Sequence, residues 1–359
     1  MNVLRRGTRG EAVRDVQARL ASLGYSVDPN EHGEFGPSTE GAVRAFQQRR
    51  HLLVDGTIGE HTWDELVEAG YALGDRVLYL RVPYLRGDDI RALQAGLNML
   101  GFDAGKEDGI LGERTDRALR EFQKNVGLPL DGIVGRTTID AIARLRPIGP
   151  GPGRAAVREG EALLQLSTHL NGARIALEAG HGFAGSGPTG PTGLAEGLAS
   201  ELVAQALAAE LRMRGATPLN IWAERAGTPS DRARLANQQN ADILISLHLN
   251  AHDDPSAEGA CTFYYGRDDW VSPAGHRLAD LIQEALTTRL GLRDGRTHPM
   301  SLPLLRETRM PAVHVEPCFI TNPREEALLR DPSFHEGLAR AMADAIAAYF
   351  SPSDGFRPA

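Results

Sequence analysis

The order of apolar and polar residues repeats in the first part of the chain. In residues 10–25 the apolar positions fall three or four residues apart, as on one face of an α-helix: Val13, Val16, Leu20 and Leu23. Gly24 follows them as a helix stop. The same arrangement returns in residues 87–102, 77 positions later. The chain therefore opens with a duplicated unit of about 65 residues, and a repeat of this length sets the architecture of the region.

Each unit predicts two further helices. In the first unit one helix covers residues 39–49, and a shorter helix begins near Gly59 and carries Trp63. The glycines and threonines between these helices recur 76 positions later in the second unit, and glycine suits the tight turns that join short helices. We therefore expect two small all-α domains of three helices each, at residues 1–72 and 78–146.

The motifs of the unit resemble the bacterial peptidoglycan-binding domain of type 1. Both copies carry an apolar-Gln pair and a Leu-Gly-aromatic end in the first helix, then G-x-x-G-x-x-T, a Phe-Gln pair and D-G-x-x-G-x-x-T. This resemblance implies that peptidoglycan or a muropeptide precursor is a partner. The same residues also serve a three-helix core, and a fold can outlast its ligand, so glycan binding by these two copies stays open.

A break in composition separates the two halves. Residues 146–154, RPIGPGPGR, are rich in glycine and proline and do not continue a helix. We assign residues 147–170 to a linker followed by a helix over 157–170. The second domain then spans residues 171–352, and residues 353–359 form a tail.

The second half alternates strand and helix patterns. Five strands are predicted, at residues 174–178, 217–222, 243–248, 261–265 and 311–316. Helical patterns lie at residues 194–213, 230–239, 272–290 and 333–350. The run ILISL is apolar throughout, which is typical of a strand buried on both faces. The predicted fold class is thus multidomain: two small all-α three-helix domains followed by an α/β domain whose mostly parallel sheet is covered by helices.

Composition and charge exclude several classes of protein. Lysine and arginine number 39 against 47 acidic residues, so the net charge is -8, and nucleic-acid binding is not expected. Two cysteines, Cys261 and Cys318, allow one bridge but no disulfide framework. No run approaches the ~18 apolar residues of a transmembrane segment. No apolar signal segment follows the basic start, so we expect a cytoplasmic protein, or a cell-envelope protein if a leader was removed.

Polar residues stand where three of the predicted strands end. His181 follows the first strand, His248 closes the third, and Glu316 closes the last. Ligands of parallel sheets gather beyond the carboxyl ends of the strands. Each histidine alone has an ordinary explanation as a hydrogen-bonded core residue, but two histidines at one rim, beside a carboxylate that is costly to bury unpaired, indicate a metal ion.

A loop rich in glycine and proline after His181 supplies a third candidate ligand. The loop ends at Glu196, in the first turn of the next helix. Glu201 is a rival, but it lies about 140° further round the same helix, so both cannot face one ion. Glu196 is preferred because it is nearer the loop. Two imidazoles and a carboxylate with a fourth position open form the usual ligand set of catalytic zinc, so a Zn²⁺ site of His181, Glu196 and His248 is predicted.

Residues 172–350 resemble the zinc-dependent N-acetylmuramoyl-L-alanine amidases of the amidase type 3 family. The family motif Asp-Pro-Gly-His-Gly-Gly appears as EAGHGF, the glutamate after the glycine-rich loop appears in GLAE, and the family's Ser-Ile-His-Ala-Asn-Ala segment appears as SLHLNA. The family's Val-Glu-x-Gly-Phe segment appears as VEPCF. The resemblance implies that His181, Glu196 and His248 ligate zinc and that Glu316 is the catalytic carboxylate.

The chemistry implied by this resemblance is hydrolysis of an amide. Zinc polarises a carbonyl and acidifies a water, while Glu316 takes the water proton and later passes it to the leaving nitrogen. The bond cut joins muramic acid to the L-alanine of the stem peptide. Two glycan-holding domains would raise the local substrate concentration. Asn250 and Arg306 also resemble family residues near the cleft, with loop hydrogen bonding as the alternative.

The five remaining histidines of the second domain are interpreted as surface or packing residues. His314 is the exception, because it alternates with Glu316 along one strand and so points to the same face, where it is a candidate to support that carboxylate. The others are His252, His276, His298 and His335.

Departures from the family motif leave an alternative function open. Glu178, Ala179, Phe183, Pro317 and Cys318 replace family residues around the site. Peptidoglycan lies outside the membrane, whereas no leader is apparent. The alternative is a cytoplasmic, non-hydrolytic regulator of peptidoglycan precursor synthesis that acts through contacts with synthesis proteins, as actinobacterial proteins of this layout are regarded. A purely glycan-binding structural protein would leave the four site groups unexplained.

Overall fold

The computed structural model describes residues 3–145, 169–181, 187–221, 227–268 and 270–351. The chain separates into two compact units, Met1–Arg158 and Glu159–Ala359. Among the described helices, none combines the length and the apolar character that crossing a membrane requires. The predicted linker lies outside the described residues, as does all but the end of the helix expected over 157–170.

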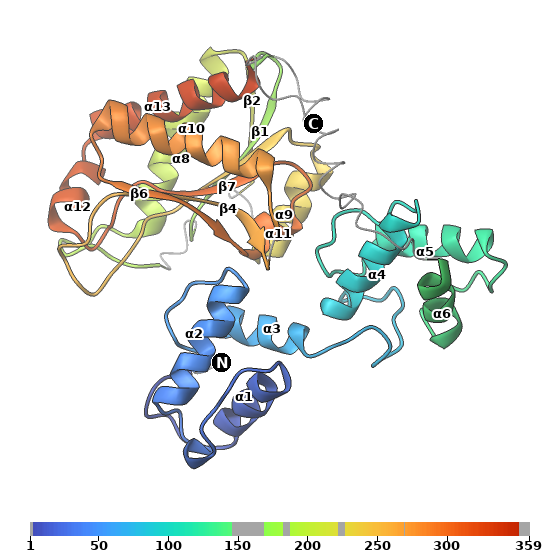
Figure 1. Cartoon of the computed structure of the whole chain (residues 1–359). Helices are drawn as coiled ribbons and strands as arrows, with labels where there is room; N and C mark the ends of the chain where they lie inside the picture. Colours follow the sequence, from blue (N-terminus) through green and yellow to red (C-terminus); the bar gives the residue numbers. More distant parts are fainter. Residues whose placement is uncertain (1–2, 146–168, 182–186, 222–226, 269, 352–359) are drawn as a thin grey trace. The chain divides into compact units, whose positions relative to one another are not determined.

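Each repeat of the first unit folds around three α-helices, as expected (Figure 1). The first repeat contains α1 (Glu11–Ser22), a short 3₁₀ helix η1 (Pro29–Glu31), α2 (Pro37–Arg49) and α3 (Glu60–Ala69). The second contains α4 (Asp88–Met99), α5 (Glu113–Asn125) and α6 (Arg136–Leu145). Each repeat buries its own apolar cluster, centred on Phe46 in the first and on Phe122 in the second. Two small cores are therefore built from one pattern.

Buried glutamine side chains hold four of the tight turns in these repeats. Gln47 Nε2 donates to Asp55 Oδ1 at 2.8 Å and to the Thr57 carbonyl at 3.0 Å, while Gln47 Oε1 accepts from Gly56 N at 2.8 Å. Gly56 has φ +76°, in the left-handed region that glycine tolerates. This glutamine clamp occurs four times, pairing Gln17 with Gly33, Gln47 with Gly56, Gln94 with Gly109 and Gln123 with Gly132. Each repeat thus uses the same device twice.

The second unit is built on one mixed sheet. Its strands are β1 (Arg174–Ala179), β2 (Thr217–Asn220), β3 (Ile243–Leu247), β4 (Ala260–Arg267), β5 (Trp270–Val271), β6 (Asp294–Met300) and β7 (Ala312–Glu316). The order along the sheet is β2-β1-β3-β7-β4-β5, and β6 pairs with β4. The pairs β2-β1, β1-β3, β3-β7 and β4-β6 are parallel, whereas β4 runs antiparallel to β7 and β5. The expected mostly parallel sheet is confirmed.

Helices cover both faces of this sheet (Figure 1). The helices are α8 (Glu196–Met213), α9 (Pro229–Gln238), α10 (Pro273–Leu290), α11 (Pro303–Glu307), α12 (Pro323–Leu329) and α13 (Pro332–Phe350). One large apolar cluster joins α8, α10 and α13 to one face, and a smaller cluster joins α9 and α11 to the other. The rim of the sheet is left for polar residues.

The structure adds elements that the patterns did not indicate. Strands β5 and β6 and helices α11 and α12 were not predicted. Strand β6 has the sequence DGRTHPM and no fully buried residue, so it lacks the apolar run of a central strand. The bridge that two cysteines allowed does not form, because Cys261 and Cys318 are both free thiols.

Candidate metal centre

Two rows of side chains cross the carboxyl ends of β1, β3 and β7. Strand side chains alternate between faces, so residues two apart on one strand share a face. The inner row consists of directly opposed residues, Glu178, Ser246 and His314. The outer row lies two residues further along the chain, at or just past the ends of these strands: Gly180, His248 and Glu316. Parallel pairing thus brings segments far apart in the sequence to one rim.

The three predicted ligands meet at this rim. One side-chain donor atom from each of His181, Glu196 and His248 lies within 4.8 Å of the others. Glu196 Oε1 is 3.0 Å from His248 Nδ1, and Glu196 Oε2 is 3.4 Å from His181 Nε2. Glu196 is buried, whereas His181 is partly exposed to solvent. The carboxylate therefore lies between the two imidazoles, with one imidazole open to solvent.

Glycines make room for these side chains. A Cβ atom on Gly180 would lie 2.4 Å from His248 Nδ1, and one on Gly187 would lie 2.9 Å from Glu196 Oε2. Both separations are too short for non-bonded atoms, so a side chain at either position would displace the donor atoms. His181 itself has φ 57°, a conformation that is uncommon for a residue with a side chain. The chain turns sharply directly after β1 and sets the imidazole at the rim.

Negative charge concentrates around His248. Its Nδ1 faces Glu196 at 3.0 Å and its Nε2 faces Glu178 at 3.4 Å. Burial lowers the pKa of His248, but hydrogen bonds and charge from Glu178 and Glu196 raise it overall to about 9. Burial raises the pKa of Glu178, but His248, the charge of Arg232 and a bond from Ser246 lower it overall to about 2. The two carboxylates thus favour a positive charge here, either a proton or a metal ion.

A second buried carboxylate holds the loop that delivers Glu196. Glu326 of α12 accepts hydrogen bonds from Thr192 N at 2.9 Å, from Thr192 Oγ1 at 2.9 Å and from Leu194 N at 3.1 Å. A Cβ on Gly190 would lie 2.5 Å from the Glu326 carboxyl carbon. The sequence interpretation missed Glu326, because its partners lie more than 130 residues earlier in the chain.

Glu316 lies beside the ligand cluster and is held by its own strand. His314 Nε2 is 3.1 Å from Glu316 Oε1, and the His314 ring centroid is 4.4 Å from that of His248. The predicted shared face of His314 and Glu316 is thus observed as a direct contact. The Glu316 side chain is 19% exposed to solvent. A carboxylate next to the candidate ligands and open to solvent suits proton transfer to a substrate.

The two residues predicted to bind substrate, Asn250 and Arg306, are less well placed for that role. Asn250 Oδ1 accepts from the Ala251 amide, and its backbone joins the segment after Glu316 through Ile320. Arg306 is buried at 3% exposure and pairs with Glu307, which suits a structural contact. Their substrate-binding role stays a prediction.

The rival carboxylate and the other histidines lie outside the cluster. Glu201 is buried and accepts a hydrogen bond from Gln205, and it is not part of the three-ligand group. His335 is also buried and bonds the Leu329 carbonyl. His276 stacks on Tyr264. These contacts match the packing role expected for them.

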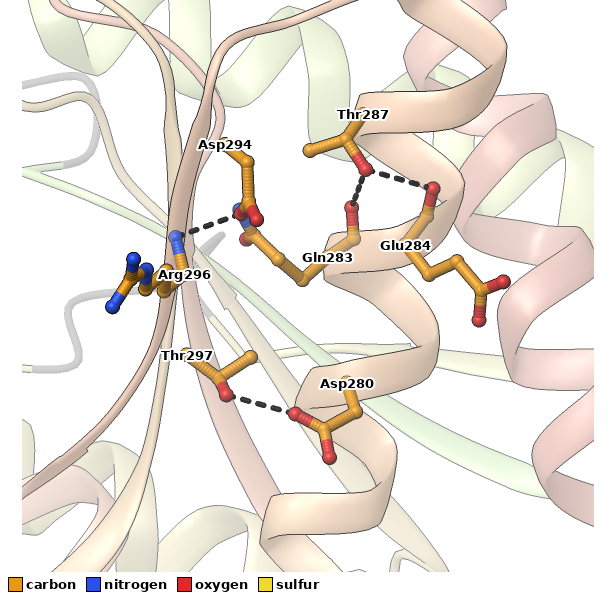
Figure 2. Close-up of a pocket in the computed structure, with 7 residues that line it drawn as sticks. All are labelled: Asp280, Gln283, Glu284, Thr287, Asp294, Arg296 and Thr297. Atoms are coloured by element: carbon orange, nitrogen blue, oxygen red, sulfur yellow. Dashed lines mark hydrogen bonds between the residues drawn. The ribbon is translucent and has the colours of Figure 1, made fainter.

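An open hollow lies between α10 and β6, on the face of the sheet opposite to the one that carries Glu316 (Figure 2). Thr262 of β4 points to this face and bonds Gln283, whereas its neighbour Cys261 is opposed to Glu316. The polar groups of the hollow bond one another, as Thr297 does with Asp280. The hollow contains none of the predicted site residues.

The donor set at the rim fits zinc. Imidazole nitrogen and carboxylate oxygen are zinc ligands, and the usual catalytic set is two or three such groups with one position left for water or substrate. His181, Glu196 and His248 supply three, and the exposed side of His181 leaves access from solvent. The outer imidazole nitrogen of a zinc-binding histidine is usually held by a carboxylate, as Glu178 faces His248 Nε2 here.

Fold and site together define an α/β domain with a candidate metal site at the carboxyl ends of its parallel strands. Residues 175–348 match the N-acetylmuramoyl-L-alanine amidase family, and residues 9–66 and 86–142 each match the putative peptidoglycan binding domain. The chain is 36% identical to the N-acetylmuramoyl-L-alanine amidase CwlM of Mycobacterium tuberculosis, over 99% of this chain and 92% of that protein. The chain therefore belongs to the N-acetylmuramoyl-L-alanine amidase family and carries two peptidoglycan-binding domains ahead of the amidase domain.

Two more distant relatives match about half of the chain. The amidase LytC of Bacillus subtilis is 30% identical over 187 residues, which cover 52% of this chain and 37% of LytC. The crystal structure of an N-acetylmuramoyl-L-alanine amidase from Clostridium difficile 630 matches at 26% identity with a TM-score of 0.46, over 50% of this chain and 97% of that chain. The layout with two preceding domains is the one shared with CwlM.

Proposed function

We propose that the α/β domain is a zinc-dependent N-acetylmuramoyl-L-alanine amidase. Its substrate is the amide between muramic acid and the L-alanine of the stem peptide, in peptidoglycan or in its precursors. The observation that carries the proposal is the meeting of His181, Glu196 and His248 within 4.8 Å, beside Glu316. The family of the chain supports the same reaction.

The residues of the rim have different roles in the proposed reaction. His181, Glu196 and His248 would hold the ion, which when bound polarises the amide carbonyl and an attacking water. Glu316 accepts the proton of that water and returns it to the departing nitrogen of L-alanine. Glu316 is available for this because it lies beside the three ligands and keeps part of its surface exposed.

The two repeats are proposed to hold the glycan. Binding by one module makes the next encounter of the amidase domain with the same polymer intramolecular, which raises the effective concentration of substrate. This proposal concerns affinity for the polymer and leaves the chemistry at the rim unchanged.

The test is hydrolysis by the full-length, zinc-loaded protein. Muropeptides and soluble precursor are incubated with the protein, and released stem peptide is measured by mass spectrometry. We expect release by the wild type, and a loss of at least ~10³-fold in Glu316→Gln with zinc still bound, since the general base is removed. Glu284→Gln, an exposed acid on α10, is the matched control and should keep full activity.

Failure of the wild type to release stem peptide while it binds zinc would contradict the amidase proposal. Together with binding to an enzyme of precursor synthesis, it would support the alternative, a non-hydrolytic regulator that acts through protein contacts. Departures from the family motif at Glu178 and Pro317 are the observation that keeps this alternative in the test.

A further inference from the structure

The inner row of the rim is a buried line of polar side chains behind the site. Glu178, Ser246 and His314 are opposed across β1, β3 and β7, and their exposed fractions are 0%, 0% and 9%. Buried polar groups are costly unless they bond one another. Ser246 Oγ lies 2.6 Å from Glu178 Oε2 and 3.0 Å from His314 Nδ1. The row is therefore a continuous set of hydrogen bonds.

Both ends of the inner row reach the outer row. At one end Glu178 Oε2 lies 3.4 Å from Nε2 of His248, and at the other His314 Nε2 lies 3.1 Å from Oε1 of Glu316. The proposed metal ligand and the proposed catalytic carboxylate are thus connected through three buried side chains. Arg232 closes the outer side of Glu178, at 3.1 Å from Oε1.

Counting hydrogens fixes the direction of these bonds. An ionised carboxylate only accepts, and a serine hydroxyl has one hydrogen to donate. Ser246 donates its one hydrogen to Glu178, whose other oxygen lies 3.1 Å from the Arg232 guanidinium, so the Ser246 oxygen is left to accept from His314. His314 must then carry a hydrogen on Nδ1. Its Nε2 lies 3.1 Å from Glu316 Oε1 and needs a hydrogen of its own to donate to an ionised carboxylate, so this set of bonds requires hydrogens on both ring nitrogens of His314.

We propose that Ser246 and His314 are positioning residues of the amidase reaction, which with Glu178 form a buried hydrogen-bonded chain that joins His248 to Glu316. The inference rests on the proposed function. Glu178 keeps the His248 ring turned so that Nδ1 faces Glu196 and the ion. His314 holds one carboxylate oxygen of Glu316, so the other oxygen is the one that reaches the water.

The first test does not depend on turnover. Long-range ¹⁵N–¹H correlation spectra of the full-length protein, with the imidazoles labelled, report which ring nitrogen carries hydrogen, and His314→Gln assigns the signal. We expect a protonated Nδ1 on His314 in the wild type, with and without zinc. Ser246→Ala should perturb the His314 and His248 signals together. An unprotonated Nδ1, or a Ser246→Ala spectrum in which the His248 signal is unchanged, would overturn the proposal.

The second test separates positioning from packing. His314→Leu should lower kcat by ~10–100-fold while KM and zinc affinity change less than about threefold, as is usual for residues that orient a site. His314→Gln keeps an N–H toward Glu316 and should recover most of the loss. The matched control is His335→Gln, which removes another buried imidazole bonded to a carbonyl. Equal kcat in His314→Leu and His335→Gln, at equal thermal stability, would overturn the proposal.

The two tests distinguish failure of the inference from failure of the proposed function. If the wild type does not hydrolyse muropeptides, the amidase proposal fails, yet the ring-nitrogen spectra still decide whether the chain of bonds exists. If the wild type hydrolyses and the His314 signal lacks the Nδ1 hydrogen, the amidase stands and the inference falls.

Discussion

The two halves of the chain bury polar side chains in different ways. In the repeats, four of the buried polar side chains are neutral glutamines, and each of these amides is bonded to the backbone of one turn, as Gln47 is to Gly56 and Thr57. At the rim of the α/β domain, buried charged groups face one another, as Glu178 faces Arg232 and His248.

This difference separates residues that build a fold from residues that serve a site. An amide offers a donor and an acceptor together, so one glutamine can close a turn and need nothing further. A buried carboxylate is stabilised by positive charge nearby. Two carboxylates, Glu178 and Glu196, face the single imidazole of His248, so a metal ion would supply further positive charge here. We therefore expect mutations in the first set to change stability and mutations in the second set to change binding and turnover.

Among changes that affect metal binding, the largest effect is expected from Glu196→Gln. The change removes the proposed charged ligand between the two imidazoles and should weaken zinc binding at least ~100-fold. Without zinc, the folded Glu196→Gln protein should be nearly as stable as the wild type, because one of the two carboxylates close to His248 has been removed. Competition with a chromogenic chelator measures the affinity, and thermal melts measure the stability.

Glu201→Gln is the control for this change. Glu201 lies on the same helix, is also buried, and was the rival ligand by sequence. It should keep zinc affinity within about threefold, because its carboxylate lies outside the ligand group. The reverse result, with zinc lost in Glu201→Gln and kept in Glu196→Gln, would mean that the ligand is misassigned.

A smaller effect, and on stability alone, is expected from Gln47→Leu. The change removes the bonds to Asp55 and Thr57 and leaves Gly56 N without its acceptor, which should cost about 3 kcal/mol of the unfolding free energy of this repeat. Calorimetry of the full chain measures the loss, and zinc affinity should be unchanged. Gln48→Leu, on the exposed side of the same helix, should cost less than about 0.5 kcal/mol. Equal losses in the two variants would show that the clamp contributes nothing.

Much of the fold could be predicted because periodicity is a local property. The repeated spacing in α1 and α4, and the apolar run of β3, each lie within about a dozen residues of sequence. Short elements escape this reasoning, and α11 and α12 have five and seven residues. Edge strand β6 lacks the apolar signal altogether.

The site was predictable as far as strand ends could be located. His181, His248 and Glu316 stand at the ends of strong strand patterns, so their meeting follows from a parallel sheet. The inner row carried a signal too, since a polar residue precedes each outer-row position by two. Its partners depend on the register between β1, β3 and β7, which the sequence does not contain.

The smallest expected effect comes from Glu326→Gln, which tests whether a buried charge away from the ion also serves the site. The glutamine keeps one acceptor oxygen but lacks the negative charge that strengthens the hydrogen bonds from the Thr192 and Leu194 amides. The unfolding free energy of the α/β domain should therefore fall by about 1–2 kcal/mol at neutral pH. Since these bonds hold the loop that delivers Glu196, zinc affinity should fall a few-fold. Calorimetry and chelator competition measure the two effects.

The pH dependence of two neighbouring glutamates sharpens this test. Burial raises the pKa of Glu326, but the loop amides and Thr192 lower it overall, below its ordinary 4.5. Its stabilisation is therefore complete above pH 4.5 and is lost as pH falls through the lowered pKa, so Glu326→Gln should approach the wild type in acid.

For Glu325 burial dominates and raises the pKa above 4.5, so the wild-type residue favours folding in acid and loses this contribution as pH rises through the raised pKa. Melts between pH 3 and 7 should thus show the cost of Glu326→Gln growing with pH and that of Glu325→Gln shrinking. A cost of Glu326→Gln that stays constant over this range would mean that hydrogen-bond shape, rather than charge, holds the loop.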